Sequence, residues 1–284
     1  MLSYRHGFHA GNHADVLKHS VLVFLLDYLS RKNKPWQFVD THAGAARYDL
    51  DSEWARKNAE HESGIATLWP CADLPPLLAA YVAHVRRLNP DGTLRSYPGS
   101  PQLALQCARR EDRLRLFELH PNESEVLRSH LADAGSRVQI KAQDGYAGLA
   151  SVLPPPTRRG LILIDPSYEE KSDYVRVVTV LEEALKRFAT GIYMVWYPLL
   201  QRLEARRFAA SLERMAKAAS IDWLNASLCV HAPSPDGFGM HGSGVFIVNP
   251  PWTLPDALQP ALAFLESALR QDNAATSSLH WQIA

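Results

Sequence analysis

The chain has 284 residues, 46% of them hydrophobic, and its basic and acidic side chains are equal in number at 30 each. This composition supports a large buried core and excludes a mainly disordered chain. Zero net charge argues against a protein that holds nucleic acid mainly through phosphates, so any such contact must be local.

Membrane and secreted proteins fit the sequence poorly. The apolar stretch "VLVFLLDYL" is interrupted by Asp27 and is too short to cross a membrane. The N-terminal "MLSYRHGFHAGNHADV" carries histidines and an aspartate where a signal peptide would be apolar. The three cysteines, Cys71, Cys107 and Cys229, show no CxxC spacing. This pattern predicts a reduced, cytoplasmic protein without disulfides or a thiolate zinc site.

The first predicted element is a helix that begins near Asp15, which would be its N-cap. It runs through "VLKHSVLVFLLDYLSRK" until Asn33 and Pro35 end it. Lys18 and His19 fall in its first turn, where the helix dipole favours a negative charge. We therefore expect these two residues to meet an anionic group of a ligand.

Short apolar runs then alternate with helical stretches. Predicted strands end at Asp40, Glu118, Asp144 and Asp165, and are followed by "GIYMVWYP", "WLNASLCVHA" and "GVFIVNPP". Helices are expected at 100–110, 121–133, 173–188, 200–218 and 255–269. This alternation predicts an α/β fold with a mostly parallel sheet, and the short linker "PSPDGFGMHGS" makes the last two strands an antiparallel hairpin. The outline is that of the Rossmann-like class I methyltransferases, which use S-adenosylmethionine (SAM).

Residues 51–95 interrupt the alternation with two helical patterns, "EWARKNAEHESGIATLW" and "LPPLLAAYVAHVRRL". The next clear helix opens at Ser100 and Pro101, with the serine as N-cap and the proline at the first helical position. We interpret 51–95 as a small helical insertion subdomain, expected to overhang the site. The methyltransferase domain would then comprise 1–50 and 96–284, with 1–35 as its N-terminal motif and helix.

Acidic side chains end the four predicted parallel strands, at the edge of the sheet where α/β proteins bind ligands. Glu118, after the second of these strands, suits two ribose hydroxyls, and Asp144 with Gly145 suits an adenine amino group. Ser100 opens a helix and suits the same anion as Lys18 and His19, for which the methionine carboxylate of SAM is the candidate. The sequence therefore predicts a SAM site at this edge.

Two tetrapeptides compete for the catalytic role, Asp165-Pro166-Ser167-Tyr168 and Asn249-Pro250-Pro251-Trp252. Methylation of an exocyclic amino group needs a side-chain acceptor and a backbone carbonyl that together hold the two N–H groups. Asp165 and the Pro166 carbonyl supply these acceptors, and Tyr168 would stack on a base flipped out of its helix. Strand order favours Asp165, because the strand before Asn249 should end away from the cofactor.

The N-terminal histidines raise a metal site as an alternative. Their spacing suits one helix face in part, but Gly7, Gly11 and Asn12 interrupt any helix there; the histidines are His6, His9, His13 and His19. Carboxylates at ligand spacing are also missing. We therefore predict no metal and retain a metal-dependent hydrolase only as an alternative function.

Several motifs together resemble the RlmJ family of bacterial enzymes, which methylate an adenine N6 in 23S ribosomal RNA. They are "MLSYRHGFHAGNHADVLKH", "DTHAGAARY", "YPGSP", "ELHP", "DGY", "RRGLILIDP", "FATGIY", "WYP" and "NPPW". The resemblance spans essentially the whole chain. It implies a SAM-dependent methyltransferase with a helical insertion that acts as a monomer on a small piece of rRNA.

The resemblance also implies roles for individual residues. The family's cofactor contacts fall on His19, His42, Ser100, Glu118, Asp144 and Gly145, with Lys18 alongside. Its catalytic acid falls on Asp165, and its RNA-contacting tyrosine falls on Tyr4. The resemblance accounts for His42, which stands in "DTHAGAA" where a small residue is usual. This chain has Ser167 where the family usually has a second proline, which bears on loop rigidity and not on the type of reaction.

Three other functions stay open at this point. The tetrapeptide does not separate adenine in RNA from adenine in DNA or from a protein glutamine, because all present an amino group. The metal-dependent hydrolase belongs to another class, and a third possibility is an RNA-binding module without catalysis.

Overall fold

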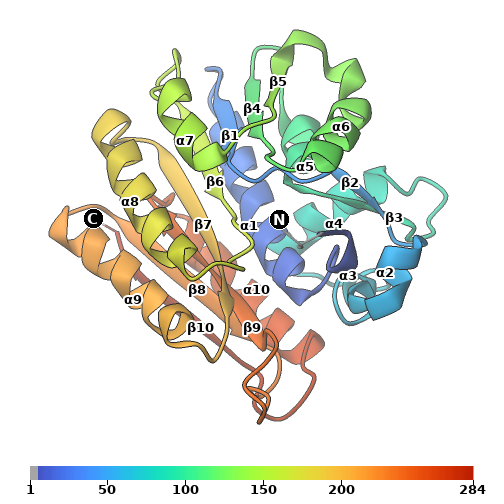
Figure 1. Ribbon diagram of the computed structural model, residues 1–284. Coiled ribbons are helices and arrows are strands. Elements are labelled where there is room, and N and C mark those ends of the chain that lie inside the picture. The colour runs from blue at the N-terminus through green and yellow to red at the C-terminus, as the bar shows by residue number, and fades with distance from the viewer. Residues whose placement is uncertain (1–5, 284) are drawn as a thin grey trace.

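A computed structural model of the protein describes residues 6–283. Tyr4 lies outside the described residues. One sheet of eight strands runs through the structure in the order β10-β8-β9-β7-β6-β1-β4-β5 (Figure 1). The strands are β1 Gln37–Asp40, β4 Arg113–Phe117, β5 Val138–Lys141, β6 Gly160–Ile164, β7 Ile192–Leu199, β8 Trp223–Cys229, β9 Gly242–Val248 and β10 Thr276–Gln282.

The strand directions confirm the predicted fold class. Strands β5, β4, β1, β6 and β7 are parallel to one another, and β9 is antiparallel to both β7 and β8. The predicted hairpin of β8 and β9 is therefore present. It is not the end of the sheet, because β10 follows and pairs antiparallel with β8.

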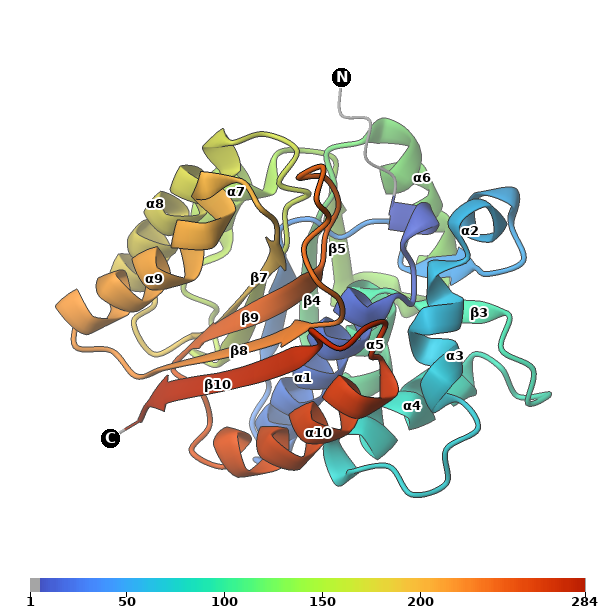
Figure 2. The same cartoon turned by 90° about the horizontal axis from the view of Figure 1, so that it is seen from below.

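Helices cover both faces of this sheet (Figure 2). One face packs against α1 His13–Ser30, α5 Ser100–Cys107 and α10 Leu254–Ala268, and α6 Pro121–His130 lies beside β5. Helix α4 Pro76–Arg87 packs on α1 and α10. The other face packs against α7 Gly145–Leu149, α8 Ser172–Arg187 and α9 Leu203–Ala218. Strand β6 shows why both faces need a cover, because all of its residues are buried. Leu161 and Leu163 enter the apolar core on one face, and Ile162 and Ile164 enter the core on the other.

Two helix starts differ from their predicted positions. Helix α1 begins at His13, and its N-cap is Asn12, whose side-chain oxygen accepts hydrogen bonds from the Ala14 and Asp15 amides at 3.0 Å. Asp15 is not the cap, because its carboxylate is buried in other contacts. Helix α5 begins at Ser100 with Gly99 as N-cap, so Ser100 is its first residue.

The segment 51–95 is largely helical, as predicted. It contains α2 Glu53–Asn58, the 3₁₀ helix η2 Glu60–Ser63, α3 Ile65–Leu68 and α4. Strands β2 Arg47–Asp49 and β3 Ser96–Pro98, which the sequence did not predict, pair antiparallel and bring the two ends of this segment together. The interpretation of residues 51–95 as a separate subdomain stays a prediction. Among residues 6–283, none of the helices is both long and apolar enough to cross a membrane.

Candidate active site

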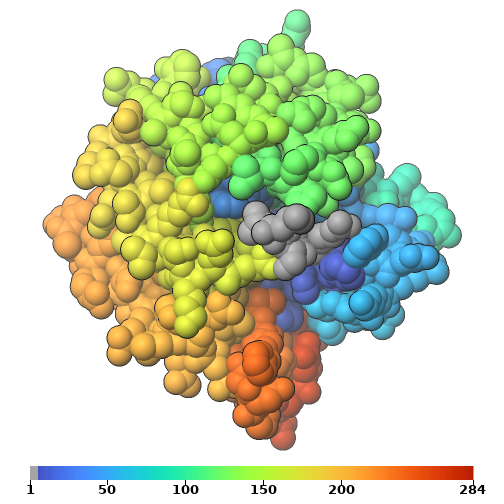
Figure 3. Space-filling model, in the orientation of Figure 1, coloured from blue at the N-terminus to red at the C-terminus, as the bar shows by residue number. Residues whose placement is uncertain are grey.

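A cavity of about 320 Å³ lies at the carboxyl ends of the parallel strands. Its wall is formed by the segments that follow β1, β4, β5 and β6, together with residues of α1 and the start of α5. In Figure 3 the surface is hollowed here, between the green and yellow-green segments. No described residue of 51–95 lines the cavity.

Glu118 follows β4 and is held in one orientation at the cavity. Its Oε2 accepts a hydrogen bond from the Gly44 amide at 2.8 Å, and its Oε1 accepts one from the His120 amide at 2.7 Å. Burial raises the pKa of the Glu118 carboxyl above its ordinary value, an effect that the two amides oppose. Each oxygen keeps a lone pair for a further donor, which fits the predicted contact with two hydroxyls.

Asp144 and Gly145 form the next part of the wall. Asp144 caps α7 by accepting the Tyr146 amide at 2.8 Å, and its other oxygen pairs with Arg176 of α8. Burial would raise the pKa of Asp144, but Arg176 and the backbone amides lower it below the ordinary value. A Cβ on Gly145 would lie 1.9 Å from the Thr41 carbonyl oxygen. Only a residue without a side chain fits at this position.

His42 lines the cavity between these carboxylates. Its Nδ1 is 2.8 Å from the Thr41 hydroxyl, and its ring meets the edge of the Tyr146 ring with centroids 4.8 Å apart. Burial lowers the pKa of His42 to about 4. The ring is therefore neutral at physiological pH and offers a flat, partly apolar surface.

Ser100 also lines the cavity, but its hydroxyl is engaged. It donates a hydrogen bond to Asp40 Oδ2 at 2.6 Å, and the His42 amide donates to Oδ1 of the same carboxyl at 3.1 Å. Asp40 is fully buried, and burial raises its pKa to about 7. Through these two hydrogen bonds, Asp40 holds the loop after β1 in place beside the cavity.

Lys18 joins the N-terminal helix to the predicted catalytic loop. Its Nζ lies 2.7 Å from Asp165 Oδ2 and 3.0 Å from Asp15 Oδ1. Asp15 also accepts the Gly11 amide at 2.9 Å and pairs with His6 at 3.0 Å. Burial would lower the pKa of Lys18, but the two carboxylates raise it above its ordinary value. The ammonium therefore remains charged.

His19, the next residue after Lys18, also lines the cavity, and its ring forms a hydrogen bond toward the interior of the protein. Its Nδ1 is 2.7 Å from the Tyr97 hydroxyl, which is 2.8 Å from the Tyr81 hydroxyl. Burial lowers the pKa of His19 to about 3, so it is a neutral ring. The prediction that Lys18 and His19 lie in the first turn of α1 is wrong, because the helix begins at His13, two residues before Asp15.

Of the tetrapeptide predicted to be catalytic, Asp165, Pro166 and Ser167 line the cavity directly after β6. Tyr168 does not, and the prediction that it stacks on a base is not supported by its position. Its side chain is 1% exposed, its backbone has φ of 53°, and its hydroxyl donates to the Trp196 carbonyl at 2.7 Å. The ring packs among aromatic side chains of α8 and α9, because the turn after Ser167 directs it into the core.

The competing tetrapeptide lies away from the cavity. Val248, before Asn249, pairs with Tyr193 at the start of β7, while Asp165 follows the end of β6. The Asn249 amide group donates to the Ala189 and Gly191 carbonyls at 2.8 and 2.7 Å. Its side chain thus holds a loop at the opposite edge of the sheet, which confirms the argument from strand order.

The N-terminal histidines bond to separate partners. His6 contacts Asp15, and His9 Nδ1 is 2.9 Å from Glu60 of η2. His13 is buried, and burial lowers its pKa to about 4. The sequence reasoning missed Asp15 and Arg176 as site residues. Asp15 precedes Lys18 by three positions and His19 by four, a spacing that places all three on one helix face.

Comparisons with known proteins show the family to which the chain belongs. The model of the family described as "Ribosomal RNA large subunit methyltransferase D, RlmJ" matches residues 33–283. The chain is 45% identical over 281 residues to Ribosomal RNA large subunit methyltransferase J of Escherichia coli, with 99% of each chain covered. It is 43% identical over 282 residues to the protein of the same name from Haemophilus influenzae, again with 99% of each covered.

A solved structure is also similar. The crystal structure of protein LPL1258 from Legionella pneumophila has a TM-score of 0.86 and 35% identity to this chain, with 96% of this chain and 98% of that one covered. The family model matches most of the chain, and the two relatives are covered over 99% of their length. The chain belongs to the RlmJ family of ribosomal RNA large subunit methyltransferases.

Proposed function

We propose that this protein transfers a methyl group from SAM to the N6 atom of an adenine in 23S rRNA, acting as a monomer on RNA that is free or at an early stage of assembly. The observation that carries the proposal is the position of Asp165 and Pro166. Both line a cavity whose wall also holds Glu118, Asp144 and Gly145. The names of the relatives support rRNA of the large subunit as the substrate.

The cofactor half of the cavity fits SAM by its chemistry. Glu118 offers carboxylate lone pairs for ribose hydroxyls, and Asp144 with Gly145, which also line the cavity, suits the adenine ring and its amino group. The neutral His42 ring supplies a surface for the ring to pack against. When bound there, SAM supplies a methyl group on a sulfonium.

Asp165 and the Pro166 carbonyl would hold the acceptor amino group. Each accepts one N–H, so that the nitrogen lone pair turns out of the plane of the base toward the methyl group. Lys18 contacts Asp165 through Oδ2, which fixes the carboxylate and leaves acceptor capacity on Oδ1. The nitrogen gains the methyl group and loses one proton, which the Asp165 carboxylate can accept.

The substrate base must leave its helix to reach this cavity. Tyr4 is proposed to contact the RNA. Since Tyr168 is buried, we do not assign the stacking surface to it in this arrangement.

The test offers undermethylated rRNA, DNA and protein fractions to the purified protein with labelled SAM. We expect label in rRNA alone, as N6-methyladenine in 23S rRNA by mass spectrometry. Asp165→Ala should abolish the label, and Trp252→Ala, at an exposed residue of the competing tetrapeptide, should keep it. Label in DNA or protein would contradict the RNA proposal. Full labelling by Asp165→Ala would contradict the catalytic assignment.

A further inference from the structure

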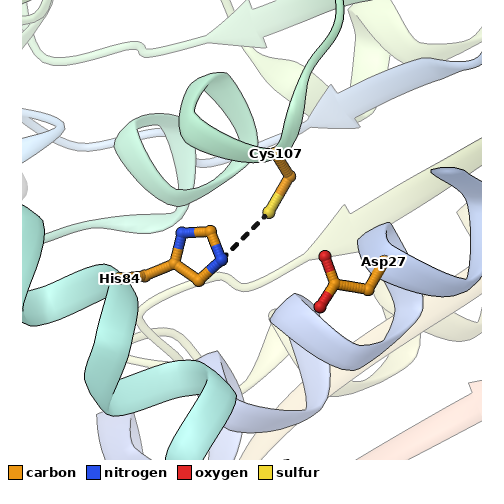
Figure 4. Close-up of side chains that lie close together, drawn as sticks. All are labelled: Asp27, His84 and Cys107. Carbon is orange, nitrogen blue, oxygen red and sulfur yellow. Dashed lines mark hydrogen bonds between the residues drawn. The ribbon is translucent and has the colours of Figure 1, made fainter.

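Three side chains with metal-binding atoms meet among helices α1, α4 and α5, and none of the three lines the cavity described above. Asp27 lies on α1, His84 on α4 and Cys107 at the end of α5 (Figure 4). One ligand atom of each lies within 4.8 Å of the other two. Among residues 6–283, no other three His, Cys, Asp or Glu side chains were found in such a group.

The spacing of the sulfur and the nitrogen already suits a tetrahedral metal. Cys107 Sγ is 3.7 Å from His84 Nε2. A zinc ion with Zn–S of about 2.3 Å and Zn–N of about 2.0 Å would hold these atoms about 3.5 Å apart. Asp27 is exposed, so its carboxylate can turn toward the pair without disturbing the core.

His84 is oriented as metal-ligating histidines usually are. It is buried, and its Nδ1 lies 2.8 Å from the side-chain oxygen of Gln106. A proton on Nδ1 donates to that oxygen, which leaves the Nε2 lone pair directed at Cys107. Arg87 lies 3.3 Å from Nδ1 and opposes a bound cation. The charges of Asp27 and of a Cys107 thiolate offset it.

Other roles for this cysteine fit less well. Burial raises the pKa of the Cys107 thiol to about 12 and lowers the pKa of His84 below its ordinary value. A neutral thiol is a poor nucleophile and a poor redox sensor. A borderline-soft cation can displace the thiol proton to solvent as it binds, because thiolate is the ligand.

We propose that Asp27, His84 and Cys107 bind a divalent cation of the zinc class, with water as the fourth ligand on the exposed side. The ion would join α4, from residues 51–95, to α1 and α5 of the methyltransferase core. It would therefore stabilise the structure and take no part in methyl transfer. This inference does not depend on the proposed substrate.

The experiment titrates Co²⁺ and then Zn²⁺ into the metal-free, full-length protein. Co²⁺ should produce a thiolate-to-metal charge-transfer band that saturates at one equivalent, and Zn²⁺ should displace it and raise the melting temperature. Cys107→Ser and His84→Ala should abolish the band. Asp27→Asn should weaken Zn²⁺ binding at least about tenfold. Cys71→Ser and Cys229→Ser, at the two other cysteines, are the matched controls and should keep the band.

The opposite results are equally clear. No band in the wild-type protein, or a band that survives Cys107→Ser and disappears in Cys71→Ser or Cys229→Ser, would overturn the proposal. Circular dichroism establishes whether Cys107→Ser folds. If Cys107→Ser does not fold, the Asp27→Asn variant supplies the test, because Asp27 is exposed. Unchanged Zn²⁺ affinity in Asp27→Asn would overturn the proposal.

Discussion

At the scale of single residues, the site depends on Lys18, which lies between the carboxylates of Asp15 and Asp165. Asp15 is 1% exposed and keeps its charge only because cations and amides surround it. Removing one partner of a buried ionic group leaves the other uncompensated, which usually destabilises a protein more than the pair stabilised it. Lys18 therefore serves both the folded state and the orientation of the Asp165 carboxylate, which we propose is catalytic.

Lys18→Met is accordingly expected to lower the free energy of unfolding by about 3–5 kcal/mol and to abolish methyl transfer. Urea unfolding and single-turnover rates measure the two effects. The double variant Lys18→Met/Asp15→Asn should recover part of the stability and none of the activity. Lys171→Met, at an exposed ion pair with Glu204, is the control and should change neither. Wild-type stability in Lys18→Met would contradict the bridging role.

A second prediction at this scale concerns Asp40, whose pKa burial raises to about 7. The folded state then binds a proton that the unfolded state releases near pH 4, so this group stabilises the fold at low pH. This stabilisation decreases as pH rises toward about 7, and above that value the contribution of Asp40 no longer changes with pH. We expect the free energy of unfolding to fall by less between about pH 5 and pH 8 in Asp40→Asn than in the wild type, because asparagine does not titrate. Equal pH dependence in both proteins would show that Asp40 is ionised throughout.

At the scale of elements, the helical segment 51–95 acts on the site through the N-terminal segment. The Ile65 amide donates to the Gly11 carbonyl at 2.8 Å, and Asn12 donates to Glu60 at 2.8 Å. Gly64 lies so close that a Cβ there would be 2.0 Å from the Gly11 carbonyl oxygen. The residues that cap α1 and carry Asp15 are thus held in place by η2 and α3.

Gly64→Ala should therefore separate α3 from the N-terminal segment. We expect a loss of about 1–3 kcal/mol in the free energy of unfolding, typical of overpacking, together with slower methyl transfer because Asp15 and Lys18 shift. Unfolding and transfer rates are measured beside Glu62→Ala, an exposed neighbour that should behave as wild type. Slower transfer in both variants would mean that the effect is not specific to this contact.

At the scale of the whole molecule, the balance of 30 basic and 30 acidic residues limits how RNA can be held. Each neutralised phosphate on single-stranded RNA adds about 0.7 to the slope of log affinity against log salt concentration. We expect a shallow slope, from fewer than about eight phosphates, and modest affinity. Fluorescence anisotropy with an rRNA fragment over a range of salt concentrations measures it. A steep slope would show that a local basic surface dominates despite the neutral total.

Much of the fold was predictable because its core strands are apolar on both faces. The strand that ends near Asp165 is a continuous hydrophobic run, and the alternation of short apolar runs with helical stretches along the chain predicted the parallel sheet. Strand β10 was missed because "TSSLHWQ" is largely polar and lies at an exposed edge. Strands β2 and β3 were missed because three residues each are too few for a pattern.

The sequence by itself determined the fold class, the family and the positions of the acids that end the parallel strands, because these follow from local apolar runs and the spacing of motifs. Only the tertiary structure decided what each side chain contacts. Lys18 of the first helix pairs with Asp165 after β6, and Tyr168 turns into the core instead of lining the cavity. Such outcomes depend on residues distant in sequence, and the compensation of a buried charge or the space for a ring is fixed only when the elements pack.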